Sequence, residues 1–155
     1  MSASSIEKII ASHPFFAGLA AESLRLVAEK ARLVELPAGE VIFHQGEAAE
    51  RFYLIRTGRV ALDVYTPRRG RYTIQTIENG EILGWSWLVP PYLWRFDARV
   101  IEPVEAIELD GRRLRELGEV DHDLGYELYK RFATLIGRRL ESTRIQLMDL
   151  YGSSH

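Results

Sequence analysis

The first thirty residues place hydrophobic side chains at the spacing of helices. One helix is expected to begin near Ser4, where Ser4 and Glu7 have the spacing of a capping box, and to end at the His13-Pro14 step. A second helix is expected over residues 21–30, because its leucines and valine recur on one face. The apolar residues between these helices are predicted to form a hydrophobic plug: Phe15, Phe16 and Leu19.

From Leu33 onward the pattern changes to the alternation of strands. Four segments show this alternation, which is typical of strands with one buried face: residues 52–55, 60–65, 72–77 and 104–109. Glycines at intervals typical of turns separate the segments: Gly39, Gly46, Gly58, Gly70, Gly80 and Gly84. The pattern predicts an antiparallel β-roll or jelly roll of about eight strands over residues 32–110.

After Asp110-Gly111 the helical spacing returns. A short helix is expected around Leu114, followed by a long helix that is capped by Asp121 or Asp123 and runs to about Leu150. One stripe of the long helix steps alternately by four and three residues and forms a heptad seam: Tyr129, Ala133, Ile136, Leu140, Thr143, Leu147 and Leu150. An exposed seam would leave apolar surface in water, so the sequence predicts a homodimer through this helix.

The expected architecture is one mainly β domain with flanking helices. It comprises N-terminal helices over residues 1–31, a β-roll over residues 32–110 and C-terminal helices over residues 111–151. A chain of 155 residues with 46% hydrophobic and 27% charged residues is long enough for one substantial core. It has no apolar segment of membrane-spanning length and no secretory signal, so a cytoplasmic location is expected.

Composition also excludes several kinds of chemistry. The chain has no cysteine, which removes disulfides, thiolate nucleophiles and cysteine-bound metals. A net charge of -2 gives no general attraction for nucleic acid. Because no helix-turn-helix segment follows the long helix before His155, direct DNA binding is not expected. The arginines of residues 68–71 are interpreted as a solvated hairpin loop.

Three tryptophans provide the most informative local feature. Trp85, Trp87 and Trp94 all fall within ten residues, directly after the glycine-bounded segment 80–84 and around Pro90-Pro91. With Tyr92 and Phe96 beside Asp97, they have the makings of an aromatic box with one anionic wall, which would favour a cationic or flat aromatic ligand. The alternative is that the rings fill the site and extend the core, leaving a protein-interaction module.

The glycine-punctuated segments resemble the cyclic-nucleotide-binding domain family, which includes the sensory domain of catabolite-activator-type regulators. The resemblance rests on residues 37–47, 52–60 and 80–84, and it covers roughly residues 14–150. It implies a β-roll fold and a ligand-sensing or regulatory function. Residues 80–98 would correspond to that family's phosphate-binding cassette, in which glycine turns lead into a short helix whose free N–H groups face the cyclic phosphate.

The cassette residues of this chain differ from those that the resemblance implies. Gly84 fits the family pattern, but Trp85 stands where glutamate usually accepts hydrogen bonds from the ribose. If Ala98 is the cassette alanine, Phe96 replaces the phosphate-binding arginine and Asp97 replaces serine or threonine. Tight binding of cAMP or cGMP is therefore not expected. The candidate ligand-binding residues are Gly84, Trp85, Ser86, Trp87, Trp94, Arg95, Phe96, Asp97, Ala98 and Thr143.

Two features leave cyclic-nucleotide binding open as an alternative. If the chain binds a cofactor at all, the resemblance implies that this cofactor is a cyclic nucleotide. Arg95 or Arg99 could hold the phosphate if the loop shifted by one residue. Thr143, which follows Arg138-Arg139 in the long helix, occupies a position where the family's hydroxyl often reaches the purine across the dimer. Pro90-Pro91 is expected to end the short cassette helix.

Catalysis receives little support from the sequence. A cupin-type metal enzyme needs several histidines that converge inside the roll, and His44 is the only histidine in the strand region. No Gly-x-Ser-x-Gly segment is present, and Ser86 has no candidate base beside it. The sequence therefore predicts no catalytic residues and no metal site.

Overall fold

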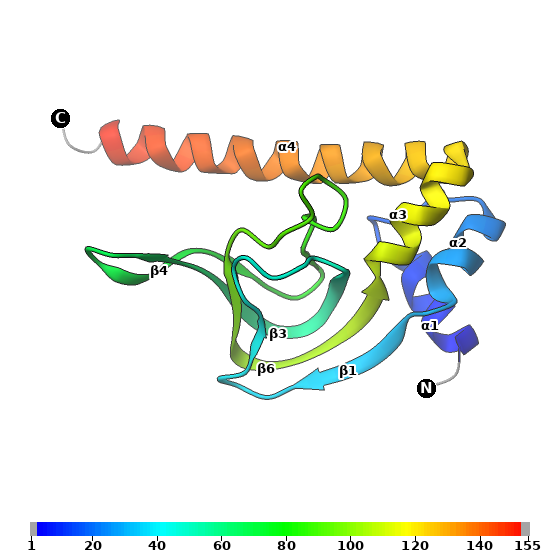
Figure 1. Cartoon of the computed structure of the whole chain (residues 1–155), viewed down its shortest axis with the longest axis horizontal. Coiled ribbons are helices and arrows are strands. Elements are labelled where there is room, and N and C mark those ends of the chain that lie inside the picture. Colours follow the sequence, from blue (N-terminus) through cyan, green and yellow to red (C-terminus); the bar gives the residue numbers. More distant parts are fainter. Residues whose placement is uncertain (1–2, 153–155) are drawn as a thin grey trace.

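The structure is a computed structural model that describes residues 3–152, with the side chains of Ala3, Gln146 and residues 150–152 left out of the description. Figure 1 shows a curved sheet lying below one long helix, α4, with the shorter helices gathered at one end. In chain order the elements are α1 Ala3–Ser12, α2 Ala21–Ala28, β1 Arg32–Leu36, β2 Val41–Phe43, β3 Arg51–Thr66, β4 Gly70–Ile77, β5 Ile82–Leu83, β6 Asp97–Asp110, α3 Gly111–Val120 and α4 His122–Gly152.

The strands form an antiparallel sheet in the order β1-β6-β3-β4, with β2 also pairing with β6 and β5 with β3. The prediction of an antiparallel β-roll with flanking helices is confirmed. The described residues form six strands where about eight were expected, and one of the two missing strands is explained because segments 52–55 and 60–65 belong to one bent strand, β3. The bend occurs at Gly58, whose φ is 107° and where an added Cβ would lie 2.3 Å from the Pro103 carbonyl oxygen. Only glycine fits that position.

The first half of α4 is attached to the roll by a buried aromatic cluster. Phe52 of β3 stacks on Trp87, with ring centroids 4.6 Å apart, and Trp87 meets Phe132 of α4 edge-on at 5.2 Å. Leu124 and Leu128, on the same side of α4, are also buried. Burial of such large aromatic side chains stabilises the attachment of α4 to the roll.

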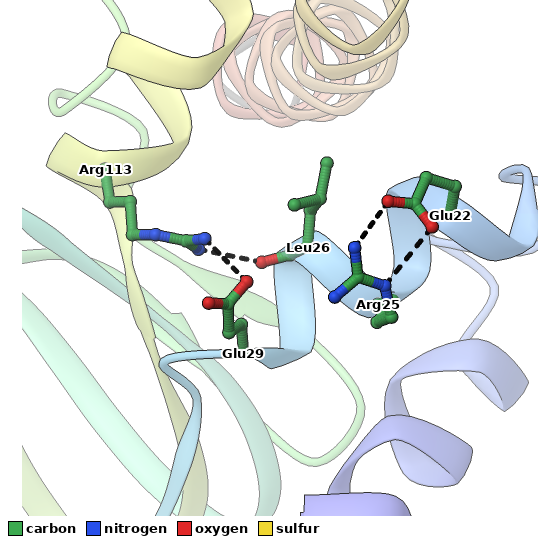
Figure 2. Close-up of polar contacts among 5 residues, drawn as sticks. All are labelled: Glu22, Arg25, Leu26, Glu29 and Arg113. Atoms are coloured by element: carbon green, nitrogen blue, oxygen red, sulfur yellow. Dashed lines mark hydrogen bonds and ion pairs between the residues drawn. The ribbon is translucent and has the colours of Figure 1, made fainter.

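Helix α3 is joined by hydrogen bonds to α2 and to Glu29, the residue that follows α2. Figure 2 shows Arg113 of α3 reaching α2, where its guanidinium donates to the Leu26 carbonyl at 2.9 Å and to the Glu29 carboxylate at 2.8 Å. The neighbouring pair of Arg25 and Glu22 lies on the exposed surface of α2 and contributes little to stability. The predicted plug occupies the connection between α1 and α2, where Phe16 and Leu19 are buried.

The long helix begins after Asp121, which resolves the two alternatives for its cap. The Asp121 carboxylate accepts a hydrogen bond from the Leu124 N–H at 3.2 Å, as an N-cap residue does, whereas Asp123 lies inside the first turn. No helix within residues 3–152 combines the length and the apolar character needed to cross a membrane.

Candidate functional site

The segment between β5 and β6, here called the cassette loop (residues 84–96), contains turns and no helix. The Leu88 N–H bonds to the Trp85 carbonyl at 3.1 Å, and the Tyr92 N–H bonds to the Val89 carbonyl at 3.0 Å. Pro90-Pro91, joined by a cis peptide bond, was expected to end a short helix, but that helix is not formed in the described loop. Since neither proline has an N–H, the helical hydrogen-bond ladder cannot continue across this pair.

Trp94 lies inside the roll directly over the first residue of the cassette loop. Gly84 has φ of 98°, and a Cβ added there would lie 2.8 Å from the Trp94 ring. The indole also stacks on Phe43 of β2, with centroids 3.7 Å apart and an interplanar angle of 7°. Trp94 is only 4% exposed, and Phe96 is buried on the same side, 6.1 Å from Phe43. Aromatic rings therefore fill the space above the cassette glycine.

The other two tryptophans do not join Trp94 around one cavity. Trp87 is fully buried between Phe52 and Phe132, on the side of the loop that faces α4. Trp85 is partly buried and packs at the edge of the core. The Ser86 hydroxyl and the Trp87 indole N–H are buried and have no hydrogen-bond partner within the described part of the chain. The three indoles thus have separate environments, and the aromatic box remains a sequence prediction.

Asp97 is held by the backbone of the connection between β2 and β3. Its carboxylate accepts a hydrogen bond from the Gln45 N–H at 2.7 Å, and the His44 ring nitrogen Nδ1 lies 3.9 Å from its other oxygen. The same connection pairs with the loop through Gly46 N–H to the Trp94 carbonyl at 2.8 Å and Trp94 N–H to the Glu47 carbonyl at 2.9 Å. These bonds fix the end of the cassette loop. Ala98, the next residue, is fully buried.

The two arginines proposed as replacements for the cassette arginine have different surroundings. Arg99 donates from Nε to the Asp63 carboxylate at 2.9 Å, so its charge is already paired. Arg95 is exposed and forms no ion pair within the described residues. Arg99 would have to leave Asp63 in order to hold a phosphate.

Asp63 is a buried carboxylate that sequence reasoning missed, because it stands inside the alternating strand segment 60–65. It is 1% exposed and also accepts a hydrogen bond from the Thr73 hydroxyl at 2.7 Å, with Arg71 3.9 Å away. Burial by itself raises the pKa of Asp63. The hydrogen bonds from Arg99 and Thr73 and the charges of Arg99 and Arg71 outweigh burial and hold this pKa below its usual value.

A cavity of about 420 Å³ lies between β4 and α4, and Thr143 is the candidate residue that lines it. Apart from Ile74, the other lining residues are polar: Thr73, Gln75, Thr76, Arg139 and Ser142. Arg139 is largely buried, which lowers its pKa, and its guanidinium donates to the Ile82 carbonyl. The Thr143 hydroxyl donates to the Arg139 carbonyl at 2.9 Å. This cavity offers hydroxyl and amide groups to a polar ligand.

The cassette loop is tied to α3 and α4 by polar contacts as well as by Trp87. Arg115 of α3 donates to the Trp87 carbonyl at 2.6 Å, and its guanidinium lies 3.8 Å from the centre of the Tyr92 ring. The Tyr129 hydroxyl of α4 donates to the Leu88 carbonyl at 3.2 Å, and burial raises the pKa of Tyr129. In Figure 1 this loop meets the underside of α4.

The predicted seam of α4 remains open to solvent in the single chain. Tyr129 and Leu140 are each 50% exposed, and Leu147 is 48% exposed. Ala133 and Thr143 are exposed, Ile136 is partly buried, and the Leu150 side chain lies outside the described residues. Sequence reasoning missed Ile145 and Met148, which are also exposed but lie off the seam.

Within the described residues, no group of three or more His, Asp or Glu side chains has metal-binding geometry.

The structure thus combines a β-roll, a glycine turn that leads into a loop before the next strand, and a long helix that covers the roll. A sequence profile described as the cyclic nucleotide-binding domain matches residues 33–121 of this chain. The chain therefore belongs to the cyclic nucleotide-binding domain family.

Individual relatives agree with this membership. A CRP-like cAMP-activated global transcriptional regulator of Mycobacterium tuberculosis is 25% identical over 146 residues, which are 94% of this chain and 63% of the relative. The chain thus spans less than two thirds of that protein. A crystal structure of a proposed cyclic nucleotide-binding protein from Geobacter metallireducens GS-15 is 32% identical, with a TM-score of 0.79, over 88% of this chain and 98% of that chain.

A second solved structure supports the fold alone. A cyclic nucleotide-binding domain from Methylobacillus flagellatus has a TM-score of 0.76 and 19% identity, over 94% of this chain and 82% of that chain.

Proposed function

We propose that this chain is a non-catalytic, homodimeric regulatory module whose roll interior is too full to hold cAMP or cGMP tightly. The Trp94 ring, stacked on Phe43 and lying against Gly84, is the observation that carries the proposal. In this family the cyclic phosphate would lie against the backbone at the start of the cassette. An indole in that place excludes the phosphate by volume, and the loop has no helix N-terminus to attract it.

Charge acts in the same direction as volume. Phe96 supplies no cation, the Arg99 cation is paired with Asp63, and Asp97 adds a carboxylate at the entrance to β6. Two like unit charges about 4 Å apart repel by about 4 kcal/mol at an effective dielectric constant of about 20. That energy is about half of the binding free energy of a micromolar ligand. A bound cyclic phosphate would have to overcome this repulsion and displace Trp94.

The homodimer is supported by the solvent-exposed seam of α4. Tyr129, Leu140 and Leu147 are each about half exposed, and a second copy of the helix would remove this apolar stripe from water. Regulation would then proceed through the contacts that link the cassette loop to α4. The module would act on a protein partner, with no direct contact to DNA from the described elements.

A second candidate function is the sensing of a small polar ligand in the cavity between β4 and α4. Thr143 and Gln75 line that cavity, and the aromatic filling does not reach it. A flat ligand without a phosphate could hydrogen-bond to these side chains. An uncharged purine or nucleoside is the chemistry that the lining fits.

Isothermal titration calorimetry with the purified chain tests the main proposal. We expect no saturable binding of cAMP or cGMP below 1 mM ligand by the unmodified protein. A triple variant, Trp94→Ala with Phe96→Arg and Asp97→Ser, opens the interior and restores a cation and a hydroxyl. It should bind cAMP at least tenfold more tightly than the unmodified chain.

The matched control is Leu93→Ala, because Leu93 is the exposed neighbour of Trp94 in the same loop. This variant should bind no more cyclic nucleotide than the unmodified chain. Micromolar binding of cAMP or cGMP by the unmodified chain would refute the proposal. Adenosine is titrated in parallel, and saturable binding that is lost in Thr143→Val would support the second candidate function.

A further inference from the structure

A second concavity lies outside the roll, and it is here called the shoulder groove. It is bounded by the connection after α1 (residues 13–15), the turn before β5 (residues 80–82) and the middle of α4 (residues 127–138). Its volume is about 430 Å³. The apolar part of its lining consists of Pro14, Phe15, Ile82 and Leu135. None of the candidate residues identified from the sequence borders it.

Hydrogen bonds between the three walls form this groove without a ligand. The His13 ring nitrogen Nε2 lies 2.6 Å from the Gly80 carbonyl oxygen, while its Nδ1 accepts from the Phe15 N–H at 3.0 Å. The accepting Nδ1 requires the proton on Nε2, which then donates to Gly80. Arg131 of α4 donates to the Phe15 carbonyl at 2.6 Å and to the Ala17 carbonyl at 2.9 Å. A groove formed in advance loses little ordering entropy when a ligand binds.

Two cations on one wall of the groove lack a counter-ion in the part of the chain that the structure describes. Lys130 and Arg138 form no ion pair within the described residues, whereas Arg131 is paired with Glu127 at 3.3 Å. Lys130, Thr134 and Arg138 recur every four residues, so they form one stripe of α4 about 12 Å long. The groove lining contains three cationic and two carboxylate side chains, which leaves an excess of one positive charge.

The position of the stripe keeps the groove accessible in the proposed dimer. At about 100° per residue, Lys130, Thr134 and Arg138 lie on a different side of α4 from Tyr129, Leu140 and Leu147. A partner helix on the seam would therefore leave the groove open. Glu81, whose carboxylate accepts from the Glu78 N–H at 2.9 Å, stands at the other wall and disfavours a ligand with two negative charges.

We propose that the shoulder groove binds the anion of a medium-chain fatty acid. The single negative charge of the carboxylate matches the unpaired Lys130 and Arg138, and the alkyl chain covers Phe15, Ile82 and Leu135. The bound chain would hold α4 against the turn that precedes the cassette loop. This site goes beyond the proposed function, because it lies outside the roll and does not require any ligand there.

Calorimetric titration with octanoate, kept below its micelle-forming concentration, tests the proposal on the full chain. Octanamide has the same chain without the charge, and octylamine reverses the charge. We expect octanoate to bind at least tenfold more tightly than either compound. From hexanoate to octanoate, affinity should rise by about fourfold for each added methylene that is buried.

Variants of α4 test the location. Lys130→Gln and Arg138→Gln should each weaken octanoate binding by about fivefold, as expected for a partly exposed charge pair. Thr134→Trp should fill the groove and abolish binding, with its circular dichroism spectrum showing that the fold is retained. Arg144→Gln, an exposed change on the same helix outside the groove, is the matched control and should leave the affinity unchanged.

The outcomes separate the proposal from its competitors. Equal affinity for octanoate and octanamide would overturn it, as would equal weakening by Arg144→Gln and Arg138→Gln. If Thr134→Trp proves unstable, the double variant Lys130→Gln with Arg138→Gln tests the location of the site instead. Both side chains are at the surface, so this variant should retain the fold. Undiminished octanoate binding by that double variant would also overturn the proposal.

Discussion

The contact between Gly84 and Trp94 can be tested by a double-mutant cycle on stability. Gly84→Ala introduces a Cβ at a residue with φ of 98° and at 2.8 Å from the Trp94 ring. The positive φ alone costs about 1–2 kcal/mol for a residue with a side chain. The clash with a packed ring adds about 1–3 kcal/mol. Trp94→Ala alone should cost about 3–5 kcal/mol, because it leaves a cavity against Phe43.

Only the clash depends on Trp94, so the two changes should not add. The double variant should be less destabilised than the sum of the single variants by about 1–3 kcal/mol. Urea unfolding, followed by circular dichroism, gives the four free energies of unfolding. Trp94→Leu replaces Trp94→Ala if the larger truncation prevents folding at 25 °C.

Gly80→Ala provides a matched control for this cycle. Gly80 also has a positive φ, 82°, but an added Cβ would have no atom within 4 Å. Its effect should therefore add to that of Trp94→Ala within about 0.5 kcal/mol. Additivity at Gly84, or equal coupling at Gly80 and Gly84, would refute the conclusion that the indole occupies the space above the cassette glycine.

Two further predictions concern the buried ion pair and the seam. Because the pKa of Asp63 is held below its usual value, its stabilising contribution is fully present above the pKa of an unfolded aspartate and is lost as the pH falls through the folded-state pKa. Asp63→Asn should lower the free energy of unfolding at pH 7 by about 2 kcal/mol. The free energy of unfolding of this variant should also decrease less in acid than that of the unmodified chain. Urea unfolding measures both quantities, and an equal decrease in acid for the two proteins would contradict the prediction. The double variant Leu140→Glu with Leu147→Glu should be a monomer in sedimentation equilibrium, because it places charges on the seam. Ile145→Glu is the control: Ile145 is similarly exposed but lies on another side of α4, so this variant should remain a dimer. A dimer that survives the seam variant, or an unmodified chain that is monomeric at micromolar concentration, would exclude the seam.

The fold could be predicted because its turn glycines and strand alternation are local features of the sequence. Segments 52–55 and 60–65 were separated at Gly58, which the structure uses as a bend within β3. The error follows from the residue itself, since glycine at a turn and glycine at a bulge have the same sequence pattern. Glycine spacing likewise did not reveal that Gly118 of α3 and Gly125 of α4 touch, which requires the three-dimensional crossing of two helices.

The candidate site was harder to predict than the fold. Trp85, Trp87 and Trp94 are neighbours in sequence, but an irregular loop has no fixed period that assigns side chains to one face. Trp87 therefore packs against α4 and Trp94 packs inside the roll. Asp63 escaped notice because its partner Arg99 is 36 residues away and pairs with it only through the register of β3 and β6.

The position of Trp87 explains how the cassette loop and α4 could influence each other without a cyclic nucleotide. Trp87 lies between Phe52 of β3 and Phe132 of α4. Arg115 and Tyr129 donate hydrogen bonds to the consecutive carbonyls of Trp87 and Leu88. A rotation of α4 would have to break the Tyr129 bond and separate two packed rings, and each loss destabilises the loop. Because Trp94 belongs to the same loop, the filled interior and the orientation of α4 would change together. A partner that binds α4 could therefore alter the roll from outside, in the reverse direction to ligand-driven regulation.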